Sequence, residues 1–570
     1  MPSPRYFVAF GVLVPLCALA CIGGKGLIDD TLITLVYARN WVELGLPLWH
    51  EKLPPVEGFT SLGHTAMLAG LIRLGLAPMA AVVAIQAAGL ALLALLFLRA
   101  TRKAGAVAAL LGLAVLLFNQ PMLTWLRGGL DAVPYAVAFF GVYLAYRDAL
   151  GRGRLGPAFA ACAAALILLR PEGALVSAGL LAHFALVQAT ARSTALGGST
   201  PPARPAPPAP AAARAGGATD WRAFAVVALG LAALVGALTL WRLDSFGQPL
   251  PNTFYAKRAA SHLSELGDGV RYVHGWLLLG GGLLTLATLA NVQAGVAGAR
   301  LRLMFIAGQV AVVIAAGGDS HHGFRFMLPV VPLLAIDVAL LLDRLRGRLR
   351  VGLVALLALA ATRQDTLLPS TPPVLRGVAT LMAEEPSPQD RLLGRFLSGS
   401  RIGAEKLAEI LPPGAAVAAD DVGALALYTR LPVLDGRGLN HAGMAHAPKD
   451  PERRNKWGTE SLGDLLGPDA PAVQLWFPRA MPWRFPAPGA ETPDCTSEAE
   501  VMSRRIRPIE AELQAAYLCV SIPAGMAEGE TLWLNTLLRR DRPDLLSALP
   551  GGSAVSDCHA LLAQLCPREE

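Results

Sequence analysis

The chain has 570 residues, of which 54% are hydrophobic and only 16% are charged, and its mean hydropathy is +0.47. Soluble domains usually carry about 25% charged residues, and here the apolar residues come in long blocks. The formal net charge is +7, but no basic stretch with interleaved aromatic residues occurs, which argues against a nucleic-acid partner. The composition predicts a polytopic membrane protein.

The apolar blocks predict eleven transmembrane helices, because a helix needs about 20 mostly apolar residues to cross a bilayer. The first block, 6–24, resembles a secretory signal, but no small-x-small cleavage site precedes a hydrophilic segment, which favours an uncleaved helix. The stretch 61–76 is shorter and contains His64 and Arg73, so we interpret it as an interfacial helix. The other predicted spans are 79–98, 104–118, 129–146, 155–169, 173–190, 223–243, 275–291, 302–317, 326–342 and 350–362.

The positions of Lys and Arg predict the orientation of these helices. With a cytoplasmic N-terminus, most of the Lys and Arg residues of the short loops fall on the cytoplasmic side, as the positive-inside rule requires. The transmembrane domain is then 1–362, with 25–78 as its first outer loop and 192–220 as a Pro/Ala-rich cytoplasmic linker. The segment 363–570 forms a periplasmic C-terminal domain. The predicted location is a bacterial inner (plasma) membrane.

The C-terminal segment reads as ordinary globular sequence. The runs 414–421 and 428–434 are typical of short strands and helices, so we expect an α/β domain. An even number of cysteines in an oxidising compartment predicts disulfides, but the sequence does not choose among the pairings. The four cysteines of this segment are Cys495, Cys519, Cys558 and Cys566.

Two adjacent carboxylates, Asp29 and Asp30, follow the first span at its outer end. After them, 32–46 carries an apolar stripe at helical spacing that suits a helix lying along the membrane surface. Either Asp alone can simply cap this helix, because Asp is a favoured N-cap, but a cap does not account for both. Adjacent carboxylates at a membrane boundary are costly without a partner or a use, and one of them can serve as a general base.

Further polar motifs fall on the same outer face. Asp131 is either a helix N-terminal charge or a site residue, and Arg170 with Glu172 is either a pair within a turn or part of an anion site. Arg325 has the planar donor geometry that suits phosphate. The candidate residues for binding the donor phosphate or sugar are Arg170, Glu172, Asn252, Tyr255, Lys257, Asp319, His322 and Arg325, with Asp131, Arg39 and Glu57 as further candidates.

The sequence gives only weak signals for a bound metal ion and none for a nucleotide cofactor. His321 and His322 are adjacent on a loop, and adjacent histidines rarely both ligate one ion. No zinc-type Cys/His spacing occurs, and no nucleotide-binding fingerprint is present. We expect no organic cofactor, and the sequence leaves the need for a divalent cation open.

Carboxylates that face cations at a lipid–water boundary suit the transfer of a sugar from a lipid-linked phosphate. A sugar carried on a polyprenyl phosphate lies there; an Asp deprotonates an acceptor hydroxyl, and basic side chains stabilise the departing phosphate. The acceptor, whether glycan, lipid or protein, is not disclosed. One alternative is a transporter or flippase of lipid-linked sugars, which should place charged or unwound elements near the bilayer midplane. Another is a non-enzymatic assembly protein, in which the Asp pair should be dispensable.

Several motifs resemble a known family, the lipid-linked-sugar glycosyltransferases of the GT-C superfamily, and among them the bacterial branch that contains the terminal arabinofuranosyltransferases. The motifs are IDDTLITLVYARNWVELG at 28–45, PVEGFTS at 55–61, RPEG at 170–173, PNTFYAK at 251–257, GGDSHHGFRFMLPVVPLL at 317–334 and the segment 412–440. The resemblance implies a mainly α GT-C-like membrane domain with a periplasmic α/β domain. It also implies inverting transfer of arabinofuranose or another envelope sugar, with the base in the Asp29–Asp30 pair and Asp29 as the first choice.

Overall fold

The computed structural model describes most of the membrane domain and parts of the C-terminal domain. The described ranges are 27–196, 219–258, 261–319, 323–363, 401–419, 421–446, 473–475, 480–481, 516–527 and 530–557, with the isolated positions Val8 and Val14. The predicted span 6–24 and most of the linker 192–220 therefore lie outside the described residues. The candidate site residue His322 lies outside them as well.

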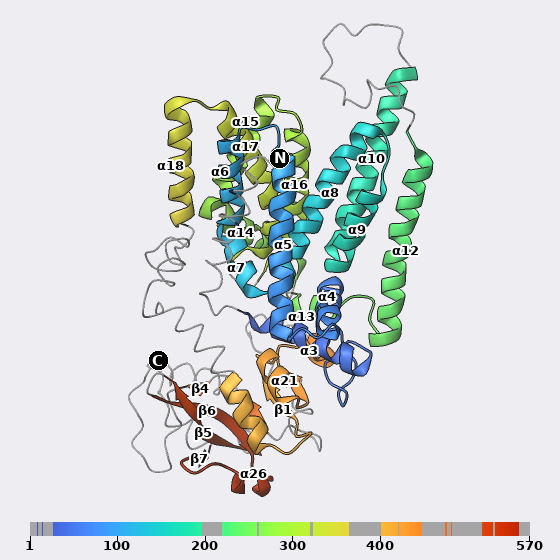
Figure 1. Cartoon of the computed structure of the whole chain (residues 1–570). Coiled ribbons are helices and arrows are strands. Elements are labelled where there is room, and N and C mark those ends of the chain that lie inside the picture. The colour runs from blue at the N-terminus through green and yellow to red at the C-terminus, as the bar shows by residue number, and fades with distance from the viewer. Residues whose placement is uncertain are drawn as a thin grey trace.

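Every other block that the sequence predicts as a span is helical. Figure 1 shows the long helices packed side by side in one bundle, with the C-terminal sheet at one end of it. The bundle helices are α5 (Pro78–Ala100), α6 (Ala106–Leu117), α7 (Gln120–Gly128), α8 (Ala132–Arg152), α9 (Pro157–Leu169), α10 (Glu172–Leu196), α12 (Trp221–Phe246), α14 (His262–Trp276), α15 (Gly282–Gln293), α16 (Ala299–Ala315), α17 (Val331–Arg344) and α18 (Gly347–Arg363).

Five helical segments of the described residues are long and apolar enough to cross a membrane: Pro78–Ala100, Glu172–Thr190, Trp221–Phe246, His262–Gln293 and Arg325–Arg344. A sixth arises if α6 and the part of α7 from Pro121, which are bent by 51°, count as one broken span. These helices confirm a multi-pass membrane protein, and the number of eleven crossings stays a prediction.

The bundle has a buried centre and a lipid-like periphery. The Arg325–Arg344 segment is mostly buried, whereas α12 is almost wholly exposed although it is strongly apolar. Val226, Leu229 and Leu240 of α12 are each about 70% exposed. Apolar side chains turned outward in this way suit hydrocarbon rather than water.

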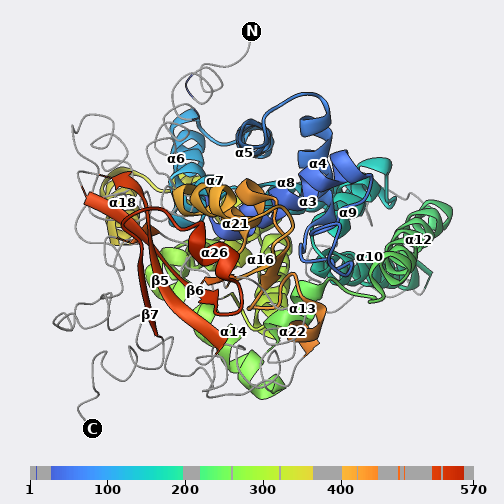
Figure 2. The same ribbon diagram turned by 90° about the horizontal axis from the view of Figure 1, so that it is seen from below.

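The first outer loop contains two helices, α3 (Asp29–Leu44) and α4 (Leu62–Arg73). Part of the apolar stripe 32–46 packs against protein, whereas Leu46 at its end is 50% exposed, so the expectation that it lies along the membrane surface stays a prediction. Leu32, Leu35 and Val36 are buried, because α3 packs between α4 and α21 (Gly423–Thr429) of the C-terminal domain. Figure 2 shows α21 lying beside α3 at this end of the bundle.

The described strands of the C-terminal domain form one mixed sheet. Its order is β2-β1-β3-β6-β5-β7, and β4 pairs with β6. β1 is parallel to both β2 and β3, so that Val417 lies opposite Val433 and Val473, and the later strands are antiparallel. The strands are β1 (Val417–Ala419), β2 (Val433–Asp435), β3 (Val473–Leu475), β4 (Ala480–Met481), β5 (Tyr517–Ala527), β6 (Glu530–Arg539) and β7 (Ala554–Asp557).

One predicted disulfide cysteine falls on this sheet. Cys519 on β5 is disulfide-bonded, and its side chain is fully buried. Cys495, Cys558 and Cys566 lie outside the described residues, so the pairing within the set of four stays a prediction.

A buried ion pair ties the helices together away from the C-terminal domain. Arg302 of α16 contacts Asp337 of α17 with an N–O distance of 2.6 Å, and both side chains are almost fully buried. Asn291 of α15 donates to the same carboxylate at 2.9 Å, and Thr288 donates to it at 3.0 Å. The carboxylate is therefore well satisfied, as a buried charge requires.

Removing either member of this pair should strongly destabilise the bundle. We expect Arg302→Ala or Asp337→Ala to lower the free energy of unfolding by about 3–5 kcal/mol, because each leaves an uncompensated buried charge. Thermal unfolding of the purified protein in detergent measures the loss. Arg300→Ala, at an exposed position of the same helix, is the control and should change stability by at most about 0.5 kcal/mol. Equal melting temperatures for Asp337→Ala and Arg300→Ala would contradict the assignment.

Candidate active site

A cavity of about 1080 Å³ opens at the end of the bundle that carries the C-terminal domain. Pockets for small molecules usually have about 300–1,000 Å³, so this one has room for a lipid-linked ligand. Its walls come from the first outer loop, the loops after α9 and α16, the segment around α13 (Asn252–Lys257), the start of α14 and Leu439 of the C-terminal domain. The candidate residues that line it are Asp30, Asp131, Arg170, Glu172, Lys257, Asp319 and Arg325.

Asp131 and Arg170 form a buried bidentate pair in the cavity wall. Arg170 Nε donates to Asp131 at 2.9 Å, and a second nitrogen donates to the other carboxylate oxygen at 3.3 Å. Arg325 contributes a second positive charge near the buried Asp131 carboxylate. Glu172 lies 3.8 Å from Arg170. Asp131 stands at the start of α8, as a helix N-terminal charge would. Its side chain nevertheless binds Arg170 in the cavity wall, as a site residue would.

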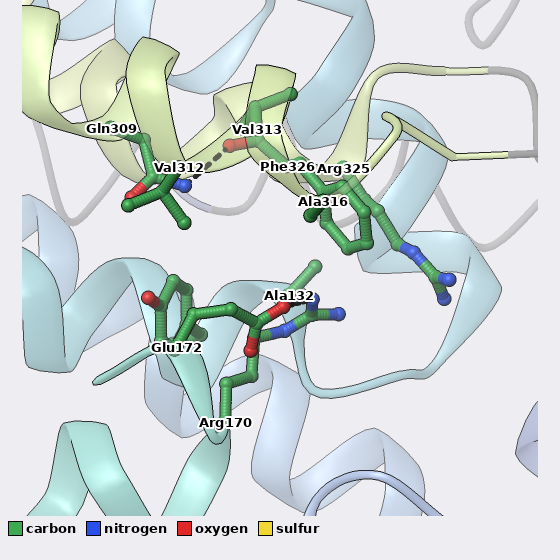
Figure 3. A pocket seen from close by; sticks show the side chains of 10 residues that line it. Ala132, Arg170, Glu172, Gln309, Val312, Val313, Ala316, Arg325 and Phe326 are labelled. Carbon is green, nitrogen blue, oxygen red and sulfur yellow. Dashed lines mark hydrogen bonds and ion pairs between the residues drawn. The ribbon is translucent and has the colours of Figure 1, made fainter. Parts of the chain in front are cut away.

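A second pair, Arg325 with Asp319, lies in the same wall. An N–H of Arg325 donates to Asp319 at 2.9 Å, and both side chains are buried. Both guanidinium groups lie over the Phe326 ring, with the central carbon of Arg170 4.5 Å and that of Arg325 5.1 Å from the ring centroid. Figure 3 shows a small neighbouring pocket, with Arg170 and Glu172 on one side and Arg325 with Phe326 on the other. Stacking on an aromatic face fixes the planar groups in place.

Asp30 lies at the cavity beside a cation. Lys257 Nζ is 3.6 Å from its carboxylate, and the Asp30 and Lys257 side chains are 20% and 39% exposed. These two side chains are thus more accessible than the two buried pairs of the opposite wall. The lysine therefore places a positive charge next to the carboxylate of Asp30.

Asp29 points to a different place. Its two carboxylate oxygens accept the backbone N–H groups of Gly423 and Ala424 at 2.9 and 3.1 Å, at the start of α21. Asp29 does not line the cavity. Burial and the charge of Asp421 raise the pKa of Asp29 to about 7, although the two backbone N–H groups lower it. Asp29 therefore caps a helix, as the sequence allowed, but the helix is α21 of the C-terminal domain and not α3.

A second contact joins the first outer loop to the C-terminal domain. The Tyr37 hydroxyl lies 3.0 Å from Asn440 Oδ1 and from the Val56 carbonyl, and it accepts the N–H of Gly58 at 3.0 Å. Asn440 is itself held by Asp435, which accepts its backbone N–H at 2.8 Å and its side-chain N–H at 2.9 Å. This junction is buried and lies directly behind the cavity wall at Gly58.

The remaining candidates belong to this junction rather than to the cavity lining. Glu57 forms a buried bidentate pair with Arg242, at 2.8 and 3.2 Å. Asn252 donates to the carbonyls of Gly438 and Leu439 at 2.8 and 2.9 Å. Tyr255 and Arg39 also contact the C-terminal domain. The Tyr255 ring is tilted against that of His446, with the centroids 4.4 Å apart, and Arg39 donates to the Leu427 carbonyl at 2.8 Å.

No group of three or more His, Cys, Asp or Glu side chains is placed to hold a metal ion within the part of the chain that the structure describes. His321 and His322 fall outside that part. The need for a divalent cation therefore stays open.

Some residues of the site were not selected from the sequence. Arg242 interrupts an apolar helix near its end, and a charge there is a signal for a buried partner. Asn440 lies in the motif 412–440 but carries no pattern of its own. His64 was noticed only as a break in an apolar stretch, and it proves to be fully buried in the cavity wall.

Comparisons with known proteins place this geometry in a fold. Residues 394–492 match the model of a domain of unknown function, DUF8728, and no curated protein matches the chain in sequence. The crystal structure of ArnT from Cupriavidus metallidurans in the apo state superposes with a TM-score of 0.51 at 15% identity, covering 98% of this chain and 100% of ArnT. ArnT bound to undecaprenyl phosphate gives 0.49 at 16% identity, covering 82% and 93%.

The archaeal oligosaccharyltransferase AglB from Archaeoglobus fulgidus, in complex with an inhibitory peptide and a dolichol-phosphate, gives a TM-score of 0.47 at 12% identity, covering 98% of this chain and 77% of AglB. The match to apo ArnT shows that the chain shares the fold of that protein. The mainly helical architecture that the sequence predicts is thus confirmed at the level of this shared fold, whereas membership of the GT-C superfamily and of its arabinofuranosyltransferase branch stays a prediction.

The unusual environment of Asp29 predicts a pH-dependent stability. The pKa of Asp29 is about 7 in the folded protein and about 4 in an unfolded chain, so the folded state binds the extra proton between these values. This contribution to stability is complete below about pH 4 and is lost as pH rises through about 7. Asp29→Asn removes it. The melting temperature of Asp29→Asn relative to wild type should therefore increase by roughly 2 °C or more from pH 5 to pH 8. A difference that does not vary with pH would contradict this environment.

The junction behind the cavity should not tolerate a side chain at Gly58. A Cβ there would lie 2.6 Å from the Tyr37 hydroxyl and would overlap Asn440. We expect Gly58→Ala to cost about 1–3 kcal/mol, because a well-packed interior resists added atoms. Gly70→Ala is the matched control, since nothing lies within 4 Å of a Cβ there and Ala is the better helix former. Thermal unfolding compares the two, and equal stability would contradict the close approach.

Proposed function

We propose that the chain is an inverting membrane glycosyltransferase that moves a sugar from a polyprenyl-phosphate donor to a cell-envelope acceptor. The observation that carries the proposal is the accessible Asp30–Lys257 pair in a large cavity at one end of a fold shared with ArnT. ArnT has been crystallised with undecaprenyl phosphate and AglB with a dolichol-phosphate. A lipid-phosphate carrier is therefore the donor type that we propose.

We assign Asp30, rather than Asp29, as the general base. Asp30 takes the proton of an acceptor hydroxyl, whose oxygen forms a bond to the anomeric carbon. The bond from that carbon to the phosphate oxygen breaks, and its electron pair goes to the phosphate. Attack from the face opposite the phosphate inverts the anomeric configuration. Asp29 is unsuited to this role because its carboxylate is engaged by the N–H groups of Gly423 and Ala424.

Lys257 is the proposed cation for the departing phosphate. Its side chain is 39% exposed and its ammonium nitrogen is 3.6 Å from the Asp30 carboxylate, so it can approach a phosphate at the cavity while it stays near the base. Arg170 and Arg325 are each neutralised by a buried carboxylate. We assign them to positioning of the donor. Preorganised positive groups at the leaving phosphate stabilise the charge that develops there.

The predicted orientation agrees with this assignment. The cavity opens beside the C-terminal domain, whose Cys519 is disulfide-bonded, and disulfides persist in oxidising compartments outside the cytoplasm. We propose an inner-membrane protein that works on the periplasmic side, where a cell-envelope acceptor is available. Arabinofuranose or another envelope sugar is the proposed transferred group, and the acceptor is a glycan, a lipid or a protein.

The Asp pair supplies a matched test. Asp30→Asn should lower turnover by about 100-fold or more, because it removes the general base. Asp29→Asn keeps the helical backbone and one capping oxygen, so it should retain at least roughly a tenth of the wild-type rate. The assay offers purified protein a panel of polyprenyl-phosphate sugars, including the arabinofuranosyl donor, with envelope glycan extract. Released polyprenyl phosphate is measured by mass spectrometry.

Two results would contradict the proposal. Wild-type turnover by Asp30→Asn would exclude Asp30 as the base. No release from any donor by the wild-type protein would contradict transferase activity and favour a transporter of lipid-linked sugars.

A further inference from the structure

His64 is a polar group of the cavity wall that the proposed chemistry does not use. Its side chain is fully buried, and neither ring nitrogen has a hydrogen-bond partner among the described residues. It nevertheless lines the cavity that contains Asp30, Asp131 and Lys257. Buried polar groups in native proteins are nearly always paired, so an exception at a cavity points to a ligand.

The local structure holds His64 in this place. Ser61 caps α4, because its hydroxyl accepts the backbone N–H of His64. Gly63 lets α4 approach α9 closely, since a Cβ there would lie 3.2 Å from the backbone of Leu168. The position of His64 therefore follows from two contacts of the backbone and does not depend on any contact of its own ring.

The imidazole is neutral in this environment. Burial lowers the pKa of His64 to about 4, although the nearby charge of Asp131 opposes the change. A neutral imidazole offers one N–H donor and one nitrogen acceptor. A phosphodiester oxygen can only accept, so it can pair with the N–H but never with the acceptor nitrogen. A hydroxyl group both donates and accepts, so it can pair with either nitrogen.

The charged groups around His64 have other partners. Asp131 binds Arg170 and Arg325 binds Asp319, each within 3.0 Å. Asp30 is next to Lys257. The ion pairs thus suit the charged part of a donor, whereas His64 presents an uncharged donor–acceptor pair in the same cavity.

We infer that His64 hydrogen-bonds a hydroxyl group of the transferred sugar and so helps to select the sugar. This inference rests on the proposed function, because it needs a sugar-bearing lipid in the cavity. Sites built to bind a hydroxyl reject analogues that lack it, since the buried polar group then stays unpaired. His64 is accordingly a specificity-determining residue, and the base remains Asp30.

The test compares a bare carrier with sugar-bearing carriers. Purified full-length wild type, His64→Leu and His64→Gln are offered undecaprenyl phosphate and the donor panel described above. We expect His64→Leu to bind undecaprenyl phosphate within twofold of wild type, while its KM for the accepted sugar donor rises at least tenfold. His64→Gln, which keeps a donor and an acceptor, should recover part of that loss.

Stability measurements keep the test decisive. The melting temperature of His64→Leu without lipid should equal or exceed that of wild type, because the variant removes an unpaired buried polar group. The control is Thr65→Val on the same helix; Thr65 is buried, its hydroxyl donates to the Ser61 carbonyl, and it is not in the cavity lining. Its KM should be unchanged.

Three outcomes would overturn the inference. Unchanged KM in a folded His64→Leu would assign His64 a packing role only. Equal losses with the bare and the sugar-bearing carrier would place His64 at the phosphate. If the wild-type protein binds neither carrier, both the proposed function and the inference about His64 fail. If the wild-type protein binds and transfers the sugar, the proposed function holds and the His64 variants test the inference alone.

Discussion

The active-site arrangement depends on the contact between the Asp29 carboxylate and the first N–H groups of α21. Successive residues of an α-helix point about 100° apart. Because Asp29 is fixed to the C-terminal domain, its neighbour Asp30 is turned to the cavity, where Lys257 lies 3.6 Å away. The buried Tyr37–Asn440 contact holds the same loop from the other side. The C-terminal domain is thus part of the framework of the site, and a separately folded membrane domain would lack both supports.

Pairing of buried charges constrains the cavity wall. Asp131 with Arg170 and Asp319 with Arg325 are each nearly buried, and such charges are tolerated only with close partners. The first pair links the loop after α9 to the start of α8, and the second lies within the segment after α16. The Phe326 ring is close to both guanidinium groups. Asp30 and Lys257 are more exposed, so each can give up its contact with the other and bind a substrate. The difference in burial supports the proposed roles, with Arg170 and Arg325 positioning the donor and Asp30 and Lys257 taking part in the transfer.

The sequence predicts the helical bundle well, because long apolar blocks and loop charges are local signals. It also gathers the polar motifs at one end. It cannot distinguish Asp29 from Asp30, since the deciding partners, Gly423 and Ala424, lie almost 400 residues away. The apolar stripe of α3 predicts a partner surface but does not say that the surface is α21 rather than lipid. His64 has no motif, and its importance comes from burial alone.

The most direct test of this account is a structure of the full chain with a polyprenyl-phosphate sugar bound. The account predicts that the phosphate lies within ion-pair distance of Lys257, with the anomeric carbon facing Asp30 inside the cavity. A donor phosphate bound outside this cavity, or one that contacts Asp29 in place of Asp30, would contradict it.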